Sequence, residues 1–316
     1  MIAKKFMWDN WIVLGLLSPM IWAIAHLIDT YFVGGDVLTD EYDGTIVTSI
    51  FHVSPLIIFP FIKLEFPPIG IFFPLIILGG LFYSISSFFY FKALFKVNDV
   101  SIIEVLANIA IALVPIMSFF ALHEQLSIMQ YIGFGITIVG ACTLSLNKSI
   151  EKHDLLKVLL PMIGAVTFLS MCVVIEEAVY RIINFWSGFL FFCLGCGLGG
   201  VIFWLIRAVK FANQRESILE ISKKNFKIFL TGELLSLVSI LLQERSIDVS
   251  SSPSLVLILQ SLIPIFILLF SFLSNIVLRE NEKLKEILMQ QTKGWTVKTI
   301  STLIIAMGIY LSIRYS

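Results

Sequence analysis

The sequence predicts an all-α integral membrane protein with ten transmembrane helices arranged as two inverted five-helix repeats. Hydrophobic residues make up 58% of the 316 residues and charged residues only 14%, a balance that a soluble domain of this size could not bury. Ten apolar segments approach the roughly 20 residues that span a bilayer. A constant offset of 149 residues separates Asp99-Val-Ser from Asp248-Val-Ser and Pro115 from Pro264. This repetition predicts two copies of one unit.

The repeat sets the expected domain organisation. Residues 1–146 would form the first repeat, 147–155 a connecting loop and 156–316 the second repeat, together making one domain. Because five helices are an odd number, the second repeat enters the membrane in the opposite sense. The predicted segments, in chain order, are 10–28, 45–62, 70–91, 100–122, 127–146, 156–175, 185–206, 226–243, 252–278 and 297–314.

Charges outside these segments suggest an orientation. The loops 207–227 and 279–298 are rich in Lys and Arg and are expected to lie on the headgroup surface as short amphipathic helices. The loop from Asp29 to Gly44 is acidic and has no Lys or Arg. Six of the 22 basic residues fall on the side that holds both termini, so the positive-inside rule predicts that both termini are outside. Residues 11–31 align with the internal segment 160–180, so the first segment is expected to be retained and not cleaved as a signal.

Composition also excludes classes of function. The chain has 22 basic and 22 acidic residues and no basic run with interleaved aromatics, so no nucleic-acid partner is expected. Cys193 and Cys196 have the spacing of a metal or redox pair but lack a second pair and a nearby His, and close helix packing is the favoured interpretation. We expect no cofactor and no metal.

Several motifs resemble a known family. Ala93-Leu94, a helix containing Pro115, Leu122-His-Glu-Gln-Leu126 and the glycines Gly133 and Gly140 look like the repeat unit of EamA-type transporters in the drug/metabolite transporter superfamily. Gln260-Ser-Leu-Ile-Pro264 and Ala306-Met-Gly308 are similar to the same pattern. The resemblance covers essentially the whole chain and implies a ten-helix carrier of small metabolites without an ATPase domain.

Charged and polar side chains inside membrane helices are the candidate site residues, because each costs roughly 2.5 to 3.5 kcal/mol at a helix centre. Glu233 lies deepest, about seven residues into its segment, and shares a helical face with Ser236, Ile240 and Gln243. It could bind an amino group or a proton, or it could hydrogen-bond a neighbouring helix. Glu104 and Asn108 form a stripe one turn apart, and Gln260 is the matching polar position before Pro264.

The first segment adds two candidates, Trp22 and His26, on one face with Pro19 and Asp29. His26 could carry a proton or serve as a packing donor, and Trp22 could stack on a solute or anchor at the interface. The second segment places a histidine on one face in the same way, and a hydroxyl face on the third segment is weak evidence of a polar cavity. Four glutamates at predicted helix ends are expected to be solvated caps or marks of orientation. The histidine face consists of Thr45, Ser49 and His52, and the hydroxyl face consists of Tyr83, Ser87 and Tyr90. The four glutamates are Glu124, Glu176, Glu177 and Glu280.

These observations favour a secondary transporter of a small polar or amphipathic metabolite, such as an amino acid, working by alternating access. A non-transporting receptor or assembly subunit is the alternative. An intramembrane enzyme is disfavoured, because no catalytic constellation is evident and no catalytic residue is assigned. The expected partners are the solute, the lipid bilayer and a proton as a candidate coupling ion, with the chain a monomer or a homodimer. A bacterial cytoplasmic membrane is the simplest location.

Overall fold

The computed structural model describes residues 8–35, 37–145, 152–211, 226–250, 252–277 and 295–315. These residues form helices joined by turns and loops, and no strand occurs among them. The prediction of an all-helical protein is confirmed. The predicted surface helices of the two basic loops fall largely on residues 212–225 and 278–294, outside the described part, as does Glu280.

The helices alternate along the chain with short connections. Before residue 146 they are α2 (Trp11–Gly34), α3 (Glu41–Phe51), the 3-10 helix η1 (Ser54–Phe61), α4 (Phe72–Val97), α5 (Val100–Ala107), α6 (Ala110–Leu122) and α7 (Ile128–Ser145). After residue 151 they are α8 (Lys152–Tyr180), α9 (Phe185–Lys210), α11 (Phe226–Ser250), α12 (Pro253–Gln260), α13 (Ile263–Val277) and α15 (Trp295–Arg314).

Six helical stretches in the described part are long and apolar enough to cross a membrane. They are Trp11–Gly34, Phe72–Val97, Lys157–Tyr180, Phe185–Lys210, Phe226–Ser250 and Pro253–Leu273. Three shorter apolar helices, Ala110–Leu122, Ile128–Gly140 and Thr299–Arg314, accompany them. The chain is therefore a multi-pass membrane protein by the length and composition of its helices.

Three predicted segments differ from a single α-helix. The segment 45–62 is wrong as one span, since α3 ends at Phe51 and η1 follows, where Pro55 and Pro60 remove backbone donors. The segment 100–122 is divided at Asn108 and Ile109 into α5 and α6. The segment 252–278 is divided at Ser261 and Leu262, so that Pro264 stands in the first turn of α13, where a missing N–H costs least.

Local chemistry explains several helix ends. The side chains of Asn10, Asn184 and Ser252 accept hydrogen bonds from the first turns of α2, α9 and α12. Helix α4 ends at Asn98 with φ 44°, and α6 ends at His123 with φ 55°. Asparagine tolerates this left-handed conformation better than most residues do.

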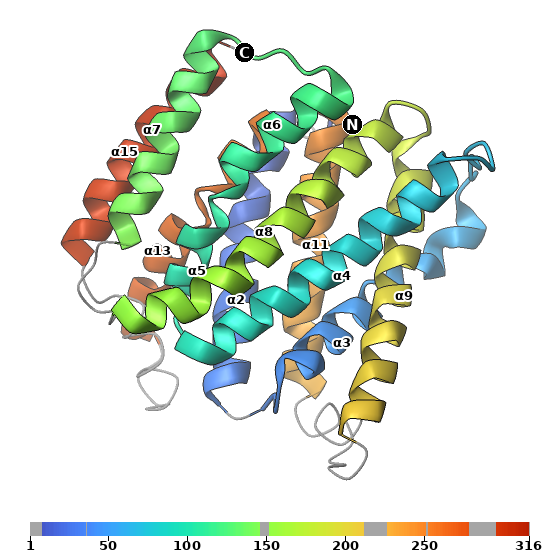
Figure 1. The fold of residues 1–316 in the computed structure, drawn as a ribbon, viewed down its shortest axis with the longest axis horizontal. Helices are drawn as coiled ribbons and strands as arrows, with labels where there is room; N and C mark the ends of the chain where they lie inside the picture. The colour runs from blue at the N-terminus through green and yellow to red at the C-terminus, as the bar shows by residue number, and fades with distance from the viewer. Residues whose placement is uncertain are drawn as a thin grey trace.

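Pairs of helices distant in sequence pack together (Figure 1). Helix α4 lies beside α8 and also contacts α9, while α2 packs on α11 and α7 packs on α15. Small residues permit the closest approaches. A Cβ on Gly80 would lie 2.1 Å from Phe192 O, and one on Gly195 would lie 2.3 Å from Ile77 O. The close helix packing expected around Cys193 and Cys196 is therefore observed, since a Cβ on Gly80 would lie 2.5 Å from Cys196 N.

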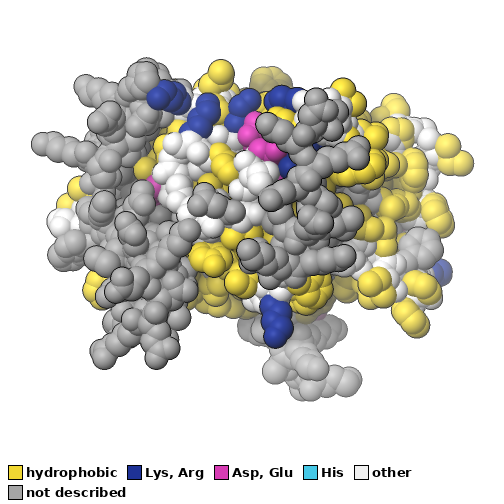
Figure 2. Space-filling view, turned by 90° about the horizontal axis from the view of Figure 1, so that it is seen from below, with side chains coloured by type: hydrophobic (Ala, Val, Ile, Leu, Met, Phe, Trp, Pro, Cys, Tyr) yellow, Lys and Arg dark blue, Asp and Glu magenta, His cyan; other side chains and the backbone are white. Residues whose placement is uncertain are grey.

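The contacts between α2 and α11 define the two ends of the bundle. Ser246 Oγ donates to Trp11 O over 2.8 Å, whereas Gly232 contacts Ile28, so the two helices are antiparallel. We call the end that holds Trp11 the upper end, as in Figure 1, and the opposite end the lower end. Figure 2 looks onto the lower end, where Lys and Arg side chains lie beside acidic ones and hydrophobic side chains cover much of the right flank.

One extramembrane loop is fastened to the start of α9. Glu65 Oε2 accepts a hydrogen bond from Asn184 N over 3.0 Å, and Glu65 N donates to Ser187 Oγ over 2.8 Å. Hydrogen bonds from the side chain and the backbone N–H of Asn184 hold the pKa of the Glu65 carboxyl below its ordinary value.

Candidate functional site

A polar cavity lies between the helices, and residues from both parts of the chain line it. Its volume open to the centres of water molecules is about 130 Å³, room for several waters or one small organic molecule. Helices α2, α4 and α5 line it from one part of the chain, and α8, α11 and α12 line it from the other. Five of the six predicted site residues are in its lining: Trp22, His26, Glu104, Asn108 and Gln260.

His26 is the centre of a cluster toward the lower end of the cavity. Its Nε2 lies 3.3 Å from Glu104 Oε1, and its Nδ1 lies 3.3 Å from Asp29 Oδ2 and 2.7 Å from Tyr90 Oη. The ring of Trp22 stacks on the imidazole with centroids 4.9 Å apart. Imidazole flanked by two carboxyl groups can hold a proton or pass one between them. The sequence pattern placed Trp22, His26 and Asp29 on one face, and that face is turned to the cavity.

Two side-chain amides border the cavity at the helix interruptions. Asn108 separates α5 from α6, and its Nδ2 has no hydrogen-bond partner. Gln260 ends α12; its Nε2 donates to Ser18 Oγ over 3.2 Å, and its Oε1 has no partner. An unpaired buried polar atom costs about 1 to 3 kcal/mol. Each amide therefore presents one unsatisfied hydrogen-bonding atom at the cavity.

A pair of glutamates, Glu176 on α8 and Glu244 on α11, forms a second acidic group in the lining. Both side chains are buried and line the cavity, and the two helices that carry them contact each other. Cys172 Sγ donates to Glu176 Oε1 over 3.2 Å, and Tyr180 Oη donates to Glu244 Oε2 over 2.9 Å. Glu176 Oε2 has no donor.

The prediction that Glu176 and Glu177 are solvated caps is wrong. Their exposed fractions are 4% and 1%, because α8 continues past residue 175 to Tyr180 and neighbouring helices cover it. Glu244 was missed because the predicted segment ended at residue 243, whereas α11 continues to Ser250. Hydropathy locates the apolar part of a helix but does not show how far the helix continues beyond it. The burial of these glutamates could therefore not be predicted from hydropathy.

Glu233 lies outside the cavity lining. It is 5% exposed, and its Oε1 accepts a hydrogen bond of 3.0 Å from Thr48, which does line the cavity. The rest of its predicted stripe, Ser236, Ile240 and Gln243, faces the cavity. Glu233 is thus separated from the cavity by one side chain.

The remaining predicted polar faces divide between cavity and packing. Tyr83, Ser87 and Tyr90 of α4 line the cavity. In α3, Ser49 Oγ donates to Ser84 Oγ over 3.0 Å, and His52 Nδ1 lies 2.6 Å from Thr48 O, so both are packing contacts. Among the described residues, no group of three or more His, Cys, Asp or Glu could hold a metal ion.

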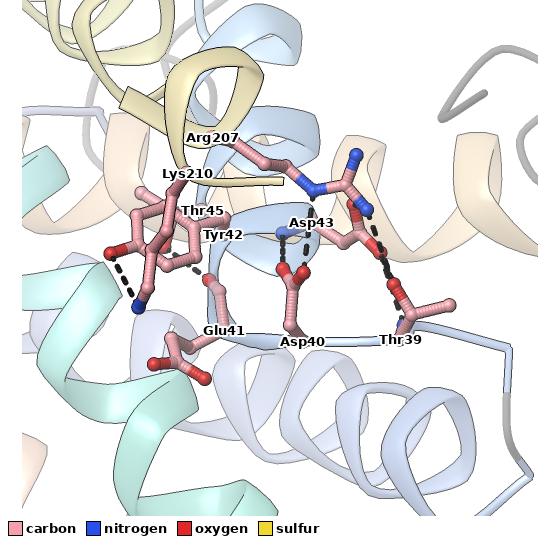
Figure 3. Close-up of polar contacts among 8 residues, drawn as sticks. All are labelled: Thr39, Asp40, Glu41, Tyr42, Asp43, Thr45, Arg207 and Lys210. Atoms are coloured by element: carbon pink, nitrogen blue, oxygen red, sulfur yellow. Dashed lines mark hydrogen bonds and ion pairs between the residues drawn. The ribbon is translucent and has the colours of Figure 1, made fainter. Parts of the chain in front are cut away.

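An ionic cluster joins α9 to the start of α3 at the lower end (Figure 3). Arg207 Nη2 lies 2.9 Å from Asp43 Oδ1, and Arg207 Nε lies 3.3 Å from Asp40 Oδ2. The same guanidinium donates to Thr39 Oγ1 over 3.2 Å. Sequence reasoning had assigned Arg207 only to a basic loop, and its partners lie more than 160 residues away.

A separate cluster lies at the upper end. Arg245 on α11 pairs with Asp9 over 3.0 Å and with Asp248. Glu124 accepts hydrogen bonds from Ser252 and, over 2.5 Å, from Ser254, so this glutamate does serve a helix start, that of α12. The cavity therefore lies between two polar clusters, one at each end of the bundle.

Apolar spanning helices around a polar cavity define a multi-pass membrane protein with an internal polar cavity. Residues 9–146 match the model of the EamA-like transporter family, a drug/metabolite transporter superfamily domain. The expected resemblance to this family is confirmed over these residues.

Solved structures show the same fold. One crystal structure of a protein is similar with a TM-score of 0.62 at 15% identity, covering 96% of this chain and 97% of that one. In all, 27 chains of solved structures match. No curated protein matches the chain.

Proposed function

We propose that the protein is a secondary carrier that moves a small polar or amphipathic metabolite, such as an amino acid or a related compound, by alternating access. The cavity is the observation that carries this proposal. It lies within apolar helices, and unpartnered polar atoms of Asn108, Glu176 and Gln260 border it. A site for a solute accounts for unpaired groups that a purely structural core would avoid.

Alternating access rests on the proposed ten-helix layout of two inverted repeats. The helix packing supports this layout, because contacts between the two proposed repeats come in matching pairs. Helix α4 packs on α8, and its counterpart α11 packs on α2. Helix α6 packs on α8, and its counterpart α13 packs on α2. The divided helices α5–α6 and α12–α13 occupy corresponding places in the two repeats. Discontinuous helices at the repeat interface are typical of carrier binding sites.

The ionic clusters at the two ends supply a physical basis for switching. Opening the lower end would separate Arg207 from Asp40 and Asp43, and opening the upper end would separate Arg245 from Asp9. A carrier needs one such closure to hold while the other releases. We place the proton, as candidate coupling ion, at the His26 cluster, with Glu233 as a second candidate.

The carrier is proposed to reside in a bacterial cytoplasmic membrane, as a monomer or a homodimer, and to act without enzymatic turnover. Transport is tested by counterflow in proteoliposomes loaded with unlabelled amino acids, amines, nucleosides or sugars. Saturable accumulation of one labelled solute class, lost when Asn108 and Gln260 are both changed to Ala, is the expected result. Binding of a solute without any counterflow would instead favour a receptor.

A further inference from the structure

We propose that Glu176 and Glu244 form a binding site for an ammonium group, so that the transported solute is a cationic amine. This inference rests on the proposed carrier function and names the substrate class of the same cavity. Neither glutamate was a candidate from the sequence.

The charge of the cavity is the first argument. Its ionisable acids are Asp29, Glu104, Glu176 and Glu244, and His26 is its one imidazole. None of the described residues that line it is Lys or Arg. Carboxyl groups removed from water are costly unless a cation accompanies them. His26 can compensate the Asp29–Glu104 end, but no basic side chain in the lining compensates Glu176 and Glu244.

The unpaired atoms are the second argument. Glu176 is 4% exposed and Glu244 is 2% exposed, yet Glu176 Oε2 receives no hydrogen bond. Gln260 Oε1, also in the lining, likewise has no donor. An ammonium group carries three donors and no acceptor, which matches two such oxygens better than an anionic or neutral solute does.

The hydrogen bonds that Glu176 and Glu244 already make do not supply a cation. Tyr180 Oη and Cys172 Sγ each satisfy one oxygen of one carboxyl group. Both are neutral donors, so they orient the carboxyl groups without neutralising them. Phe192 and Leu169, also in the lining, supply apolar surface for an alkyl chain.

Solutes of one length and different charge test the proposal on the purified full-length protein in detergent. The probes are cadaverine, pentylamine, pentanediol and glutarate, and the measurement is the concentration-dependent rise in melting temperature. Cadaverine or pentylamine should stabilise the protein, while pentanediol and glutarate should not. Equal or better stabilisation by glutarate or pentanediol, or none by either amine, would overturn the amine assignment.

Variants locate the site. Glu176→Gln and Glu244→Gln keep the shape of each side chain and should each weaken amine binding by about tenfold or more, the loss expected for one charge-assisted hydrogen bond. Glu177→Gln is the matched control, since Glu177 pairs with Arg181 and does not line the cavity. Unchanged amine affinity in Glu176→Gln and Glu244→Gln would overturn the assignment to this pair.

The outcomes separate the two proposals. If a Gln variant aggregates on size exclusion, the wild-type charge series decides the solute class alone. If amines fail but neutral or acidic solutes show counterflow, the carrier function stands and the amine inference falls. If no solute of any class shows counterflow, the carrier function falls first.

Discussion

Gln260 Nε2 donates a hydrogen bond to Ser18 Oγ over 3.2 Å, and Ser18 Oγ lies 3.2 Å from Ser239 Oγ. This contact joins the end of α12 to the middle of α2 and α11, beside the cavity. The hydrogen bond links the interruption between α12 and α13, in the second part of the chain, to the continuous helix α2 in the first part. Any movement of one part against the other must strain or break it.

Gln260→Ala should therefore weaken both solute binding and helix packing. We expect a several-fold rise in the KM of transport and a loss of about 1 kcal/mol of stability, the net value of one hydrogen bond. Ser271→Ala is the control, because the buried Ser271 hydroxyl has no partner and its loss should be neutral. A Gln260→Ala protein with unchanged KM would place the solute away from α12.

His26→Gln should separate proton coupling from solute exchange. Uptake driven by a pH gradient should fall at least about tenfold, since glutamine cannot carry the proton that imidazole can hold between Asp29 and Glu104. Counterflow without a gradient should persist. The check is both assays on one proteoliposome preparation, and equal loss in both would assign His26 to binding or folding only.

Arg207→Gln and Arg245→Gln should shift the conformational balance in opposite directions. The first removes the ion pairs of the lower end and the second those of the upper end. In a background without native cysteines, a cysteine placed at Ala107 of the lining should react several-fold faster with an impermeant thiol reagent from the loosened side. Acceleration from the same side in both variants would contradict the assignment of the clusters to opposite closures.

Gly308→Ala should destabilise the contact between α7 and α15. A Cβ there would lie 2.2 Å from Thr137 Oγ1 and 2.6 Å from Gly133 O, so the two helices would have to separate. A cost of about 1 to 3 kcal/mol is expected from such overpacking, seen as a lower melting temperature. Gly135→Ala on α7 meets nothing within 4 Å and should be neutral or stabilising.

The Glu65 loop should loosen in acid. The lowered pKa of Glu65 means that its hydrogen bonds with Asn184 favour the carboxylate, so their contribution is complete at neutral pH. It is lost as the pH falls below the ordinary value of 4.5 and through the lowered pKa of the folded protein. The protection factor of the Asn184 amide, which is its exchange rate corrected for the intrinsic pH dependence of exchange, should then fall in the wild type. Glu65→Gln should show little of this pH dependence.

Much of the fold was accessible from the sequence, because hydropathy locates apolar helices, and Pro264 lies close to the interruption between α12 and α13. The division at Asn108 was not predicted at that position, since no proline or glycine stands there and only tertiary packing shows it. The site was partly accessible: one helical face gave Trp22 and His26. Glu244 could not be predicted as a site residue, because the burial of a side chain near a helix end depends on the neighbouring helices and not on the helix itself.

The acidic groups of the cavity lie at different depths. Glu244 lies about three turns along α11 from Gly232, which contacts Ile28 beside the His26 cluster, so the two groups are roughly 18 Å apart along the helix axis. A charge that moved between them would cross part of the membrane voltage. A full crossing is worth roughly 2.3 kcal/mol per elementary charge at 100 mV. Transport of a cationic amine along this path, with no proton moving the opposite way, would therefore generate a current and respond to the electrical state of the cell.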